Sequence, residues 1–170
     1  MDDNLFAYLQ QLELITFFSG YPFIYAVVFS IAGNQQDKNS FQNRVIKLLP
    51  SGYALVGILY MGFQLKNLYP VYFIQNSNLT LHQTCGQIWG FLSLLFWIPA
   101  VAKKIILSLL HSLVFFFFLV RDIFLQLSAS TVDMHIVRND MKMYTVSLLL
   151  NLAAIVVIIL LSSLVKQYKK

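Results

Sequence analysis

Charged side chains are scarce in this chain of 170 residues, because Asp, Glu, Lys and Arg together make up only 11% of it. A soluble domain carries roughly 25% charged residues, which cover its surface and keep it in solution. Hydrophobic residues instead make up 58% of the chain. This composition excludes a soluble enzyme and predicts an integral membrane protein.

Cysteine is nearly absent as well, since Cys85 is the only one. A single cysteine excludes an intrachain disulfide, a CxxC redox pair and a cysteine-rich zinc site. The sequence also has no Walker A loop, no GxGxxG, GxSxG or HExxH motif, and no paired carboxylates inside an apolar run. We therefore expect no enzymatic activity from this chain.

The net charge of +5 does not indicate a nucleic-acid partner. The twelve Lys and Arg residues lie in short segments between apolar runs, and none of these segments is a basic patch interleaved with aromatic residues. Short loops rich in Lys and Arg tend to stay on the cytoplasmic side of a membrane. The basic residues are therefore evidence about topology.

Five apolar runs predict an all-α bundle of five transmembrane helices, because about 20 apolar residues suffice to cross the bilayer core. The predicted spans are 14–32, 48–65, 82–98, 105–122 and 144–165. Pro22 predicts a kink in the first span, since proline lacks an N–H and its ring clashes with the preceding turn. Segment 123–143 is predicted as an interfacial helix or loop, so residues 1–170 form one membrane domain with no soluble domain.

The fourth apolar run is short, and this leaves an alternative of four spans plus one interfacial or long bent helix. Both topologies put eight Lys and Arg residues on one side and four on the other when the N-terminus is outside. The positive-inside rule therefore predicts an outside N-terminus without choosing between them. We prefer five spans on hydrophobicity, and we expect a multi-pass protein of a bacterial cytoplasmic membrane.

Ionisable residues within the apolar runs are candidate functional residues, because they are costly in a bilayer without a purpose. His111 lies inside the fourth run and is a candidate haem ligand, although His82 and His135 fall at other depths. We expect no protein metal site, because no His-x-x-His pair or second cysteine completes one. Arg121 and Asp122 could belong to an ionisable path, but an arginine at the end of a span more often extends to the headgroups.

Small and polar residues form two stripes that predict close helix packing. Gly86 and Gly90 make a GxxxG pattern that Ser93 continues, which lets another helix approach closely. On the last span, Ser147, Asn151 and Ala154 lie near one face, and Asn151 can hydrogen-bond to a neighbouring helix. We expect these stripes to dock the chain against partner helices.

These observations favour a non-catalytic membrane subunit that stabilises or anchors a larger membrane complex. The expected partners are other membrane subunits and the lipid bilayer, with bound lipids and no resident cofactor. One alternative is a small-solute or ion transporter or channel component, in which Pro22 breaks a helix and Asn151, His111 or Arg121 lines a polar path. Another is a haem- or quinone-associated electron-transfer subunit that uses His111.

Overall fold

A computed structural model describes residues 14–32, 41–71, 81–128 and 134–168, and within these ranges the chain is helical without any strand. A short helical segment covers residues 14–18 and ends at a turn over Ser19 and Gly20. The following elements are α2 (Tyr21–Ala32), α3 (Phe41–Val71), α4 (Leu81–Phe91), the 3₁₀ helix η1 (Leu92–Trp97), α5 (Pro99–Ala102), α6 (Ile105–Ser128) and α7 (Met134–Tyr168). For the described residues, the prediction of an all-α fold is confirmed.

Three helices are long and apolar enough to cross a membrane, namely Arg44–Leu65, Ile105–Ser128 and Met134–Val165. They coincide with the second, fourth and fifth predicted spans. The first and third predicted spans coincide with shorter apolar helices, Leu14–Ser30 and Cys85–Trp97. The structure is therefore that of a membrane-type helical protein, and the count of five spans stays a prediction.

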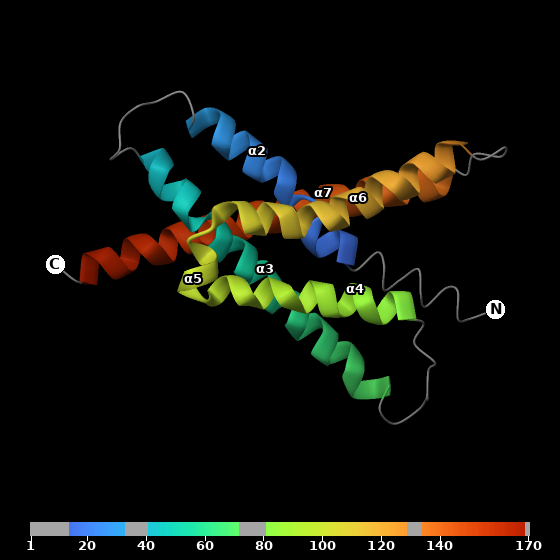
Figure 1. Cartoon of the computed structure of the whole chain (residues 1–170), viewed down its shortest axis with the longest axis horizontal. Coiled ribbons are helices and arrows are strands. Elements are labelled where there is room, and N and C mark those ends of the chain that lie inside the picture. Colours follow the sequence, from blue (N-terminus) through green and yellow to red (C-terminus); the bar gives the residue numbers. More distant parts are fainter. Residues whose placement is uncertain (1–13, 33–40, 72–80, 129–133, 169–170) are drawn as a thin grey trace.

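The helices run in alternating directions along the long axis of the molecule (Figure 1). α2, α4 and α7 run toward the end where the C-terminus lies, whereas α3 and α6 run toward the opposite end. α3 contacts α2, α6, α7 and η1, so it is the central element of the bundle. The core is formed where these helices cross, and its largest buried side chains include Phe18, Tyr21, Tyr53, Tyr60 and Phe115.

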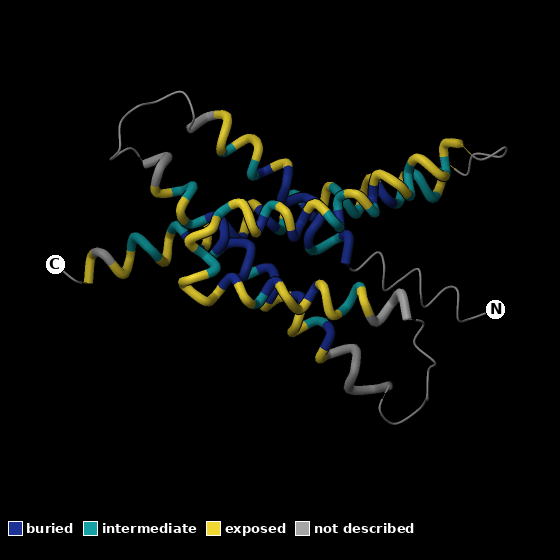
Figure 2. The backbone as a smooth tube through the Cα atoms, viewed as in Figure 1, coloured by how far each residue is buried: buried dark blue, intermediate teal, exposed yellow. Residues whose placement is uncertain are grey.

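Apolar side chains also cover the outside of the bundle. Figure 2 shows buried residues concentrated at the helix crossings and exposed residues along the outer faces. Phe117 on α6 is 64% exposed and Leu149 on α7 is 62% exposed, although both are large and apolar. Exposing so many apolar side chains to water is unfavourable, whereas the hydrocarbon of a bilayer solvates them well. The exposed faces are consistent with a membrane protein.

Two predicted segments differ in form from the observed elements. Residues 123–128 continue α6 and residues 134–143 begin α7, so segment 123–143 contributes to two long helices and forms no separate interfacial helix in its described part. The predicted span 82–98 divides into α4 and η1. The change occurs where Ser93 Oγ donates a hydrogen bond to the carbonyl oxygen of Gly90 at 2.6 Å, a local bond that competes with the regular helical pattern.

Candidate functional site

The first predicted span is interrupted at Ser19 and Gly20, immediately before Pro22. Pro22 has no N–H to donate to the carbonyl group of Phe18, four residues earlier, and its ring clashes with that carbonyl group in a continuous helix. Ser19 closes the preceding turn, because its backbone N–H and its Oγ both donate to the carbonyl oxygen of Ile15, at 3.0 and 2.6 Å. The helix therefore ends and restarts at the position where the sequence predicts a kink.

Two polar side chains of α7 bind the backbone groups that this interruption exposes. The backbone N–H of Gly20 donates to Ser147 Oγ at 2.8 Å, and Asn151 Nδ2 donates to the carbonyl oxygen of Phe17 at 2.8 Å. Asn151 Nδ2 also donates to the backbone carbonyl of Ser147, at 2.9 Å. Each unsatisfied backbone group in an apolar interior costs several kcal/mol, so Ser147 and Asn151 stabilise the interrupted helix.

The interruption lies directly against the backbone of α7, and a glycine makes this possible. A Cβ atom added at Gly20 would lie 2.6 Å from the backbone nitrogen of Leu148 and 2.7 Å from the backbone carbon of Ser147. Real Cβ atoms do not approach backbone atoms so closely. Gly20 thus sets the separation of the first span from α7.

The amide oxygen of Asn151 has no hydrogen-bond partner among the described residues. The carbonyl oxygens of Phe17 and Ser147 only accept hydrogen bonds, so the amide must turn its NH₂ group toward them. Asn151 Oδ1 is then buried, and it has no hydrogen-bond partner in the part of the chain that the structure describes. A buried amide oxygen without a donor is destabilising and calls for an explanation.

His111 occupies a second polar position in the core and makes hydrogen bonds with both ring nitrogens. Nε2 lies 2.7 Å from the carbonyl oxygen of Trp89, and Nδ1 lies 2.6 Å from the Tyr53 hydroxyl. A carbonyl only accepts, so Nε2 carries the hydrogen, and Nδ1 accepts the hydrogen of Tyr53. The imidazole and the indole of Trp89 are stacked with centroids 5.2 Å apart, and Trp89 Nε1 donates to the His111 carbonyl oxygen at 3.3 Å.

This arrangement bears on haem ligation, for which the sequence analysis singles out His111. A metal ion binds an imidazole through the lone pair of its unprotonated nitrogen. In His111 that nitrogen is Nδ1, which accepts the hydrogen bond from Tyr53. Both ring nitrogens are thus occupied by hydrogen bonds, and a haem iron could bind His111 only after Tyr53 or the Trp89 carbonyl group moved away, so ligation stays a prediction without geometric support.

Aromatic contacts join the interrupted helix to His111. The Tyr21 hydroxyl lies 2.8 Å from Ser108 Oγ, and the Tyr21 ring lies 4.4 Å from the Tyr53 ring. Phe18 stacks on Phe115 at 4.8 Å. We call this cluster the polar core, and it comprises Phe17, Phe18, Gly20, Tyr21, Tyr53, Trp89, Ser108, His111, Phe115, Ser147 and Asn151. Tyr21 and Tyr53 were not predicted as site residues, and their only signal in the sequence is a tyrosine placed well inside an apolar run.

The stripe of Gly86, Gly90 and Ser93 also packs inside the chain. A Cβ atom added at Gly90 would lie 2.8 Å from Tyr60 Cε1 and 2.9 Å from Leu14 Cδ2, and Ser93 is fully buried against Gly57. Gly86 borders Leu14 in the same way, at 3.2 Å. On α7, Ala154 is buried in the core, as are Ser147 and Asn151. These stripes bring together helices of this chain, and their docking against another protein stays a prediction.

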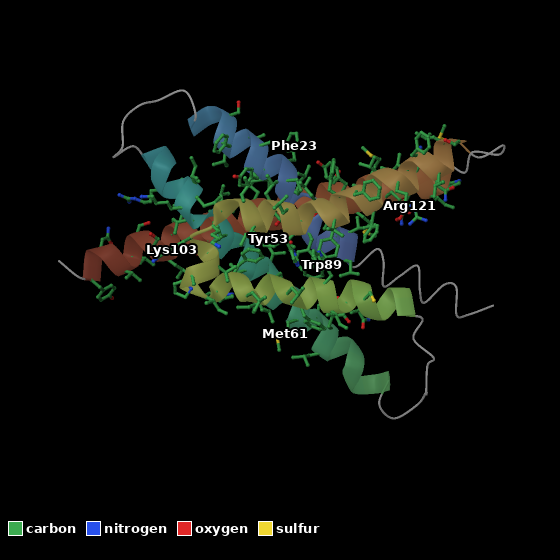
Figure 3. All side chains as sticks on the ribbon, viewed as in Figure 1. Phe23, Tyr53, Met61, Trp89, Lys103 and Arg121 are labelled. Carbon is green, nitrogen blue, oxygen red and sulfur yellow. The ribbon has the colours of Figure 1, made fainter. Side chains whose placement is uncertain are left out.

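Arg121 and Asp122 do not join the polar core. Figure 3 shows Arg121 near one end of the bundle, away from Tyr53 and Trp89. Ten residues of α6 separate it from His111, which corresponds to about 15 Å along the helix. A different carboxylate is buried, since Asp140 on α7 is only 3% exposed. In the sequence, Asp140 is marked only as the one acidic residue of segment 134–143, which also carries spaced apolar residues.

The described residues contain no group of three His, Cys, Asp or Glu side chains that could hold a metal ion. The arrangement of the polar core is instead suited to joining helices, because most of its hydrogen bonds link groups far apart in the sequence. No protein-family model, no curated protein and no solved structure matches this chain. A function for this chain is therefore inferred from its geometry.

Proposed function

We propose that the chain is a five-span membrane protein with its N-terminus outside. The alternating directions of the helices support five crossings, because successive apolar segments run between the same two ends of the bundle (Figure 1). Lys47 and Lys103 border the same cavity at one end. Arg44 precedes Lys47 on α3 by less than one turn, and Lys104 follows Lys103 directly. The positive-inside rule assigns this basic end to the cytoplasm.

Within that topology, we propose that the chain is a non-catalytic subunit that stabilises a larger membrane complex. The observation that carries this proposal is the use of polar groups in the core. His111, Tyr53, Tyr21 and Ser147 all have hydrogen bonds to other groups of the chain, so these groups hold helices together. A rigid core under apolar outer faces suits a structural subunit embedded among other helices.

Site-specific photocrosslinking in the native membrane tests this role. Benzoylphenylalanine would replace Phe117 on the outward face of α6, or Leu149 and Leu160 on α7, one position at a time. We expect a discrete protein adduct at one or more of these positions, and co-purification of the same protein in stoichiometric amount with the tagged chain. Phe115 is the matched control, because it lies two residues from Phe117 and is fully buried. Lipid adducts alone at every outward position, with a monomeric purified chain, would contradict the proposal.

A second candidate function, transport of a small solute or ion, is favoured by the interrupted first span. Interrupted helices in the interior of transporters place backbone groups where substrates or ions bind. The unpaired Oδ1 of Asn151 lies beside this interruption and could accept a hydrogen bond from a substrate or coordinate a cation. Proteoliposomes loaded with a proton- or potassium-sensitive dye would report such a flux. We expect Asn151→Leu to abolish it and Leu152→Ala, on the exposed side, to leave it unchanged.

A further inference from the structure

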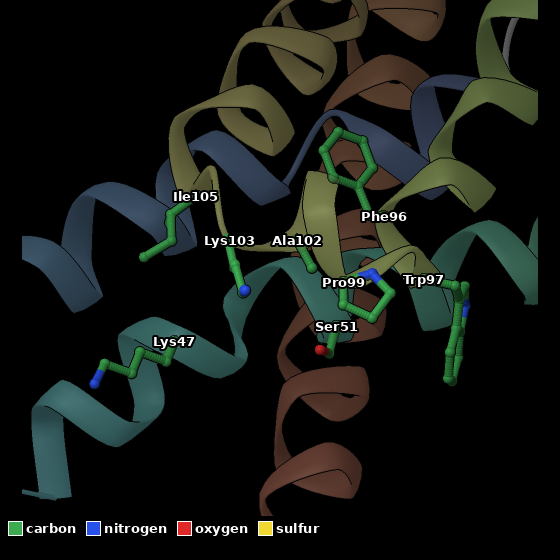
Figure 4. Close-up of a pocket in the computed structure, with 8 residues that line it drawn as sticks. All are labelled: Lys47, Ser51, Phe96, Trp97, Pro99, Ala102, Lys103 and Ile105. Atoms are coloured by element: carbon green, nitrogen blue, oxygen red, sulfur yellow. The ribbon is translucent and has the colours of Figure 1, made fainter.

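A cavity of about 480 Å³ opens at the basic end of the bundle. Three elements that are distant in the sequence form it, namely the N-terminal half of α3, the η1 and α5 segment, and the start of α6. Its lining residues are Lys47, Ser51, Phe96, Trp97, Pro99, Ala102, Lys103 and Ile105. We call this cavity the basic pocket (Figure 4). It lies outside the polar core and contributes nothing to the proposed subunit role.

Two lysines and one hydroxyl supply the polar side of the basic pocket. Lys47 and Ser51 are four residues apart on α3, so they lie on the same face of that helix. Lys103 reaches the pocket from the end of α5. The only carboxylates among the described residues belong to Asp122 and Asp140, and neither lines the pocket. Asp122 follows Arg121, which Figure 3 shows toward the opposite end of the bundle from Lys103. Figure 4 shows the Lys103 side chain directed toward α3, whereas the Lys47 ammonium group extends away from the pocket. Both lysines place positive charge at the rim of this cavity, and no carboxylate of the described residues lines it, so the rim attracts an anion.

The other walls of the basic pocket are apolar. Phe96 is buried behind the pocket, whereas Trp97 is 50% exposed at its edge, and Pro99 and Ile105 complete the surface. A free inorganic anion would cover the lysines and leave this apolar surface against water. A phospholipid would cover both, because its phosphate is joined through glycerol to acyl chains. Basic pockets between transmembrane helices on the cytoplasmic side are suited to anionic headgroups, and tryptophan favours the headgroup level of the membrane.

We propose that the basic pocket binds one anionic phospholipid. The phosphate lies at the rim of the pocket, where Lys103 and the exposed Lys47 side chain supply positive charge, and it accepts a hydrogen bond from Ser51 Oγ. The glycerol and the start of the acyl chains pack on Trp97, Pro99 and Ile105. This proposal requires that the basic end lies at a bilayer surface, but it does not require a partner protein. Failure of lipid selectivity would therefore leave the subunit role as it stands.

Native mass spectrometry of the purified full chain tests the proposal, with phosphatidylglycerol and phosphatidylcholine added in equal amounts. A lysine near an anionic headgroup favours binding by roughly fivefold, so we expect a preference for phosphatidylglycerol of about 25-fold from the two lysines. The double variant Lys47→Gln/Lys103→Gln should lose this preference. The Lys104→Gln variant is the matched control, because Lys104 adjoins Lys103 in the chain and does not line the pocket. It should retain the preference, and so should Lys47→Arg/Lys103→Arg, which keeps both charges.

Three results would overturn the proposal. Equal binding of the two lipids by the wild-type chain would show that the lysines do not select a headgroup. An equal loss in Lys104→Gln and in the double variant would assign selectivity to general surface charge. Displacement of the lipid by millimolar glycerol 3-phosphate would show that the pocket takes the free phosphate compound and needs no acyl chain.

A second measurement does not depend on the lysine variants folding correctly. Brominated acyl chains quench tryptophan fluorescence on contact, and Trp97 is at the edge of the basic pocket. Brominated phosphatidylglycerol should quench the wild-type chain more strongly than brominated phosphatidylcholine at the same mole fraction. Trp97→Phe should remove this difference, whereas equal quenching of the wild-type chain by both lipids would contradict the proposed site.

Discussion

Replacing Gly20 with alanine tests whether the interrupted helix is packed directly against α7. The added Cβ atom would lie 2.6 Å from the backbone nitrogen of Leu148, and a backbone atom of a packed helix cannot move aside as a side chain can. The first span must therefore shift away from α7. That shift also lengthens the 2.8 Å hydrogen bond between the Gly20 N–H and Ser147 Oγ.

The two effects set the expected magnitude. Overpacking of a filled interior costs about 1–3 kcal/mol. Loss of one hydrogen bond between helices in a membrane protein costs about 0.6–1.7 kcal/mol. We therefore expect Gly20→Ala to lower the free energy of unfolding by about 2–4 kcal/mol. Replacement by valine should lower it further, because two more methyl groups must be accommodated.

Reversible unfolding of the purified chain in mixed micelles, followed by circular dichroism as the SDS fraction rises, measures this change. Gly62→Ala is the matched control, because no heavy atom lies within 4 Å of the position of its added Cβ. It should be neutral or stabilising by up to about 1 kcal/mol, since alanine has the higher helix propensity. Gly52→Ala should fall between the two, because its added Cβ would meet a side-chain atom, Ile155 Cγ1, at 2.8 Å. Equal stability of Gly20→Ala and Gly62→Ala would refute the packing argument.

Three further substitutions test the polar core by the same unfolding assay. His111→Ala leaves the Tyr53 hydroxyl and the Trp89 carbonyl group unpaired and should lower the free energy of unfolding by about 2–3 kcal/mol. Separately, an absorption spectrum of the wild-type chain without a Soret band would rule out haem at His111 in the purified protein. Asn151→Ala exposes a backbone carbonyl of the interrupted helix and should cost about 1–2 kcal/mol, whereas a stabilising effect would show that its unpaired Oδ1 dominates. Phe115→Ala should cost about 3 kcal/mol more than Phe117→Ala, and similar losses would contradict the assigned orientation of α6.

The elements themselves were largely predictable. A run of apolar residues long enough to cross a bilayer must form a helix there, because only a helix satisfies its own backbone groups in hydrocarbon. This reasoning needs only local sequence, and it located the three long membrane-type helices and the two shorter apolar ones. Its spans end at residue 122 and begin again at residue 144, because hydropathy is low between them, whereas the helical backbone of α6 continues to Ser128 and that of α7 begins at Met134.

The candidate site was predictable only in fragments. Asn151 was expected to hydrogen-bond to another helix and Ser147 to lie on the same packing face, but nothing in the sequence indicated which helix they meet. Their partners, Phe17 and Gly20, lie 134 and 127 residues earlier in the chain. Tyr53 and Trp89 were not associated with His111 at all. A tyrosine in an apolar run has the same sequence signal whether its hydroxyl meets a histidine, a backbone carbonyl or the headgroup region.

The amino-acid sequence was enough to predict that this chain is helical and apolar, that its first span breaks near Pro22, and that its basic residues lie between the apolar runs. Each of these properties follows from a residue and its immediate neighbours. Only the tertiary structure decided that α7 binds the exposed backbone of that break, that the small-residue stripes pack within the chain, and that Lys47 and Lys103 share one pocket. These depend on which helices become neighbours, and that choice is made by close packing and hydrogen bonding over the whole bundle.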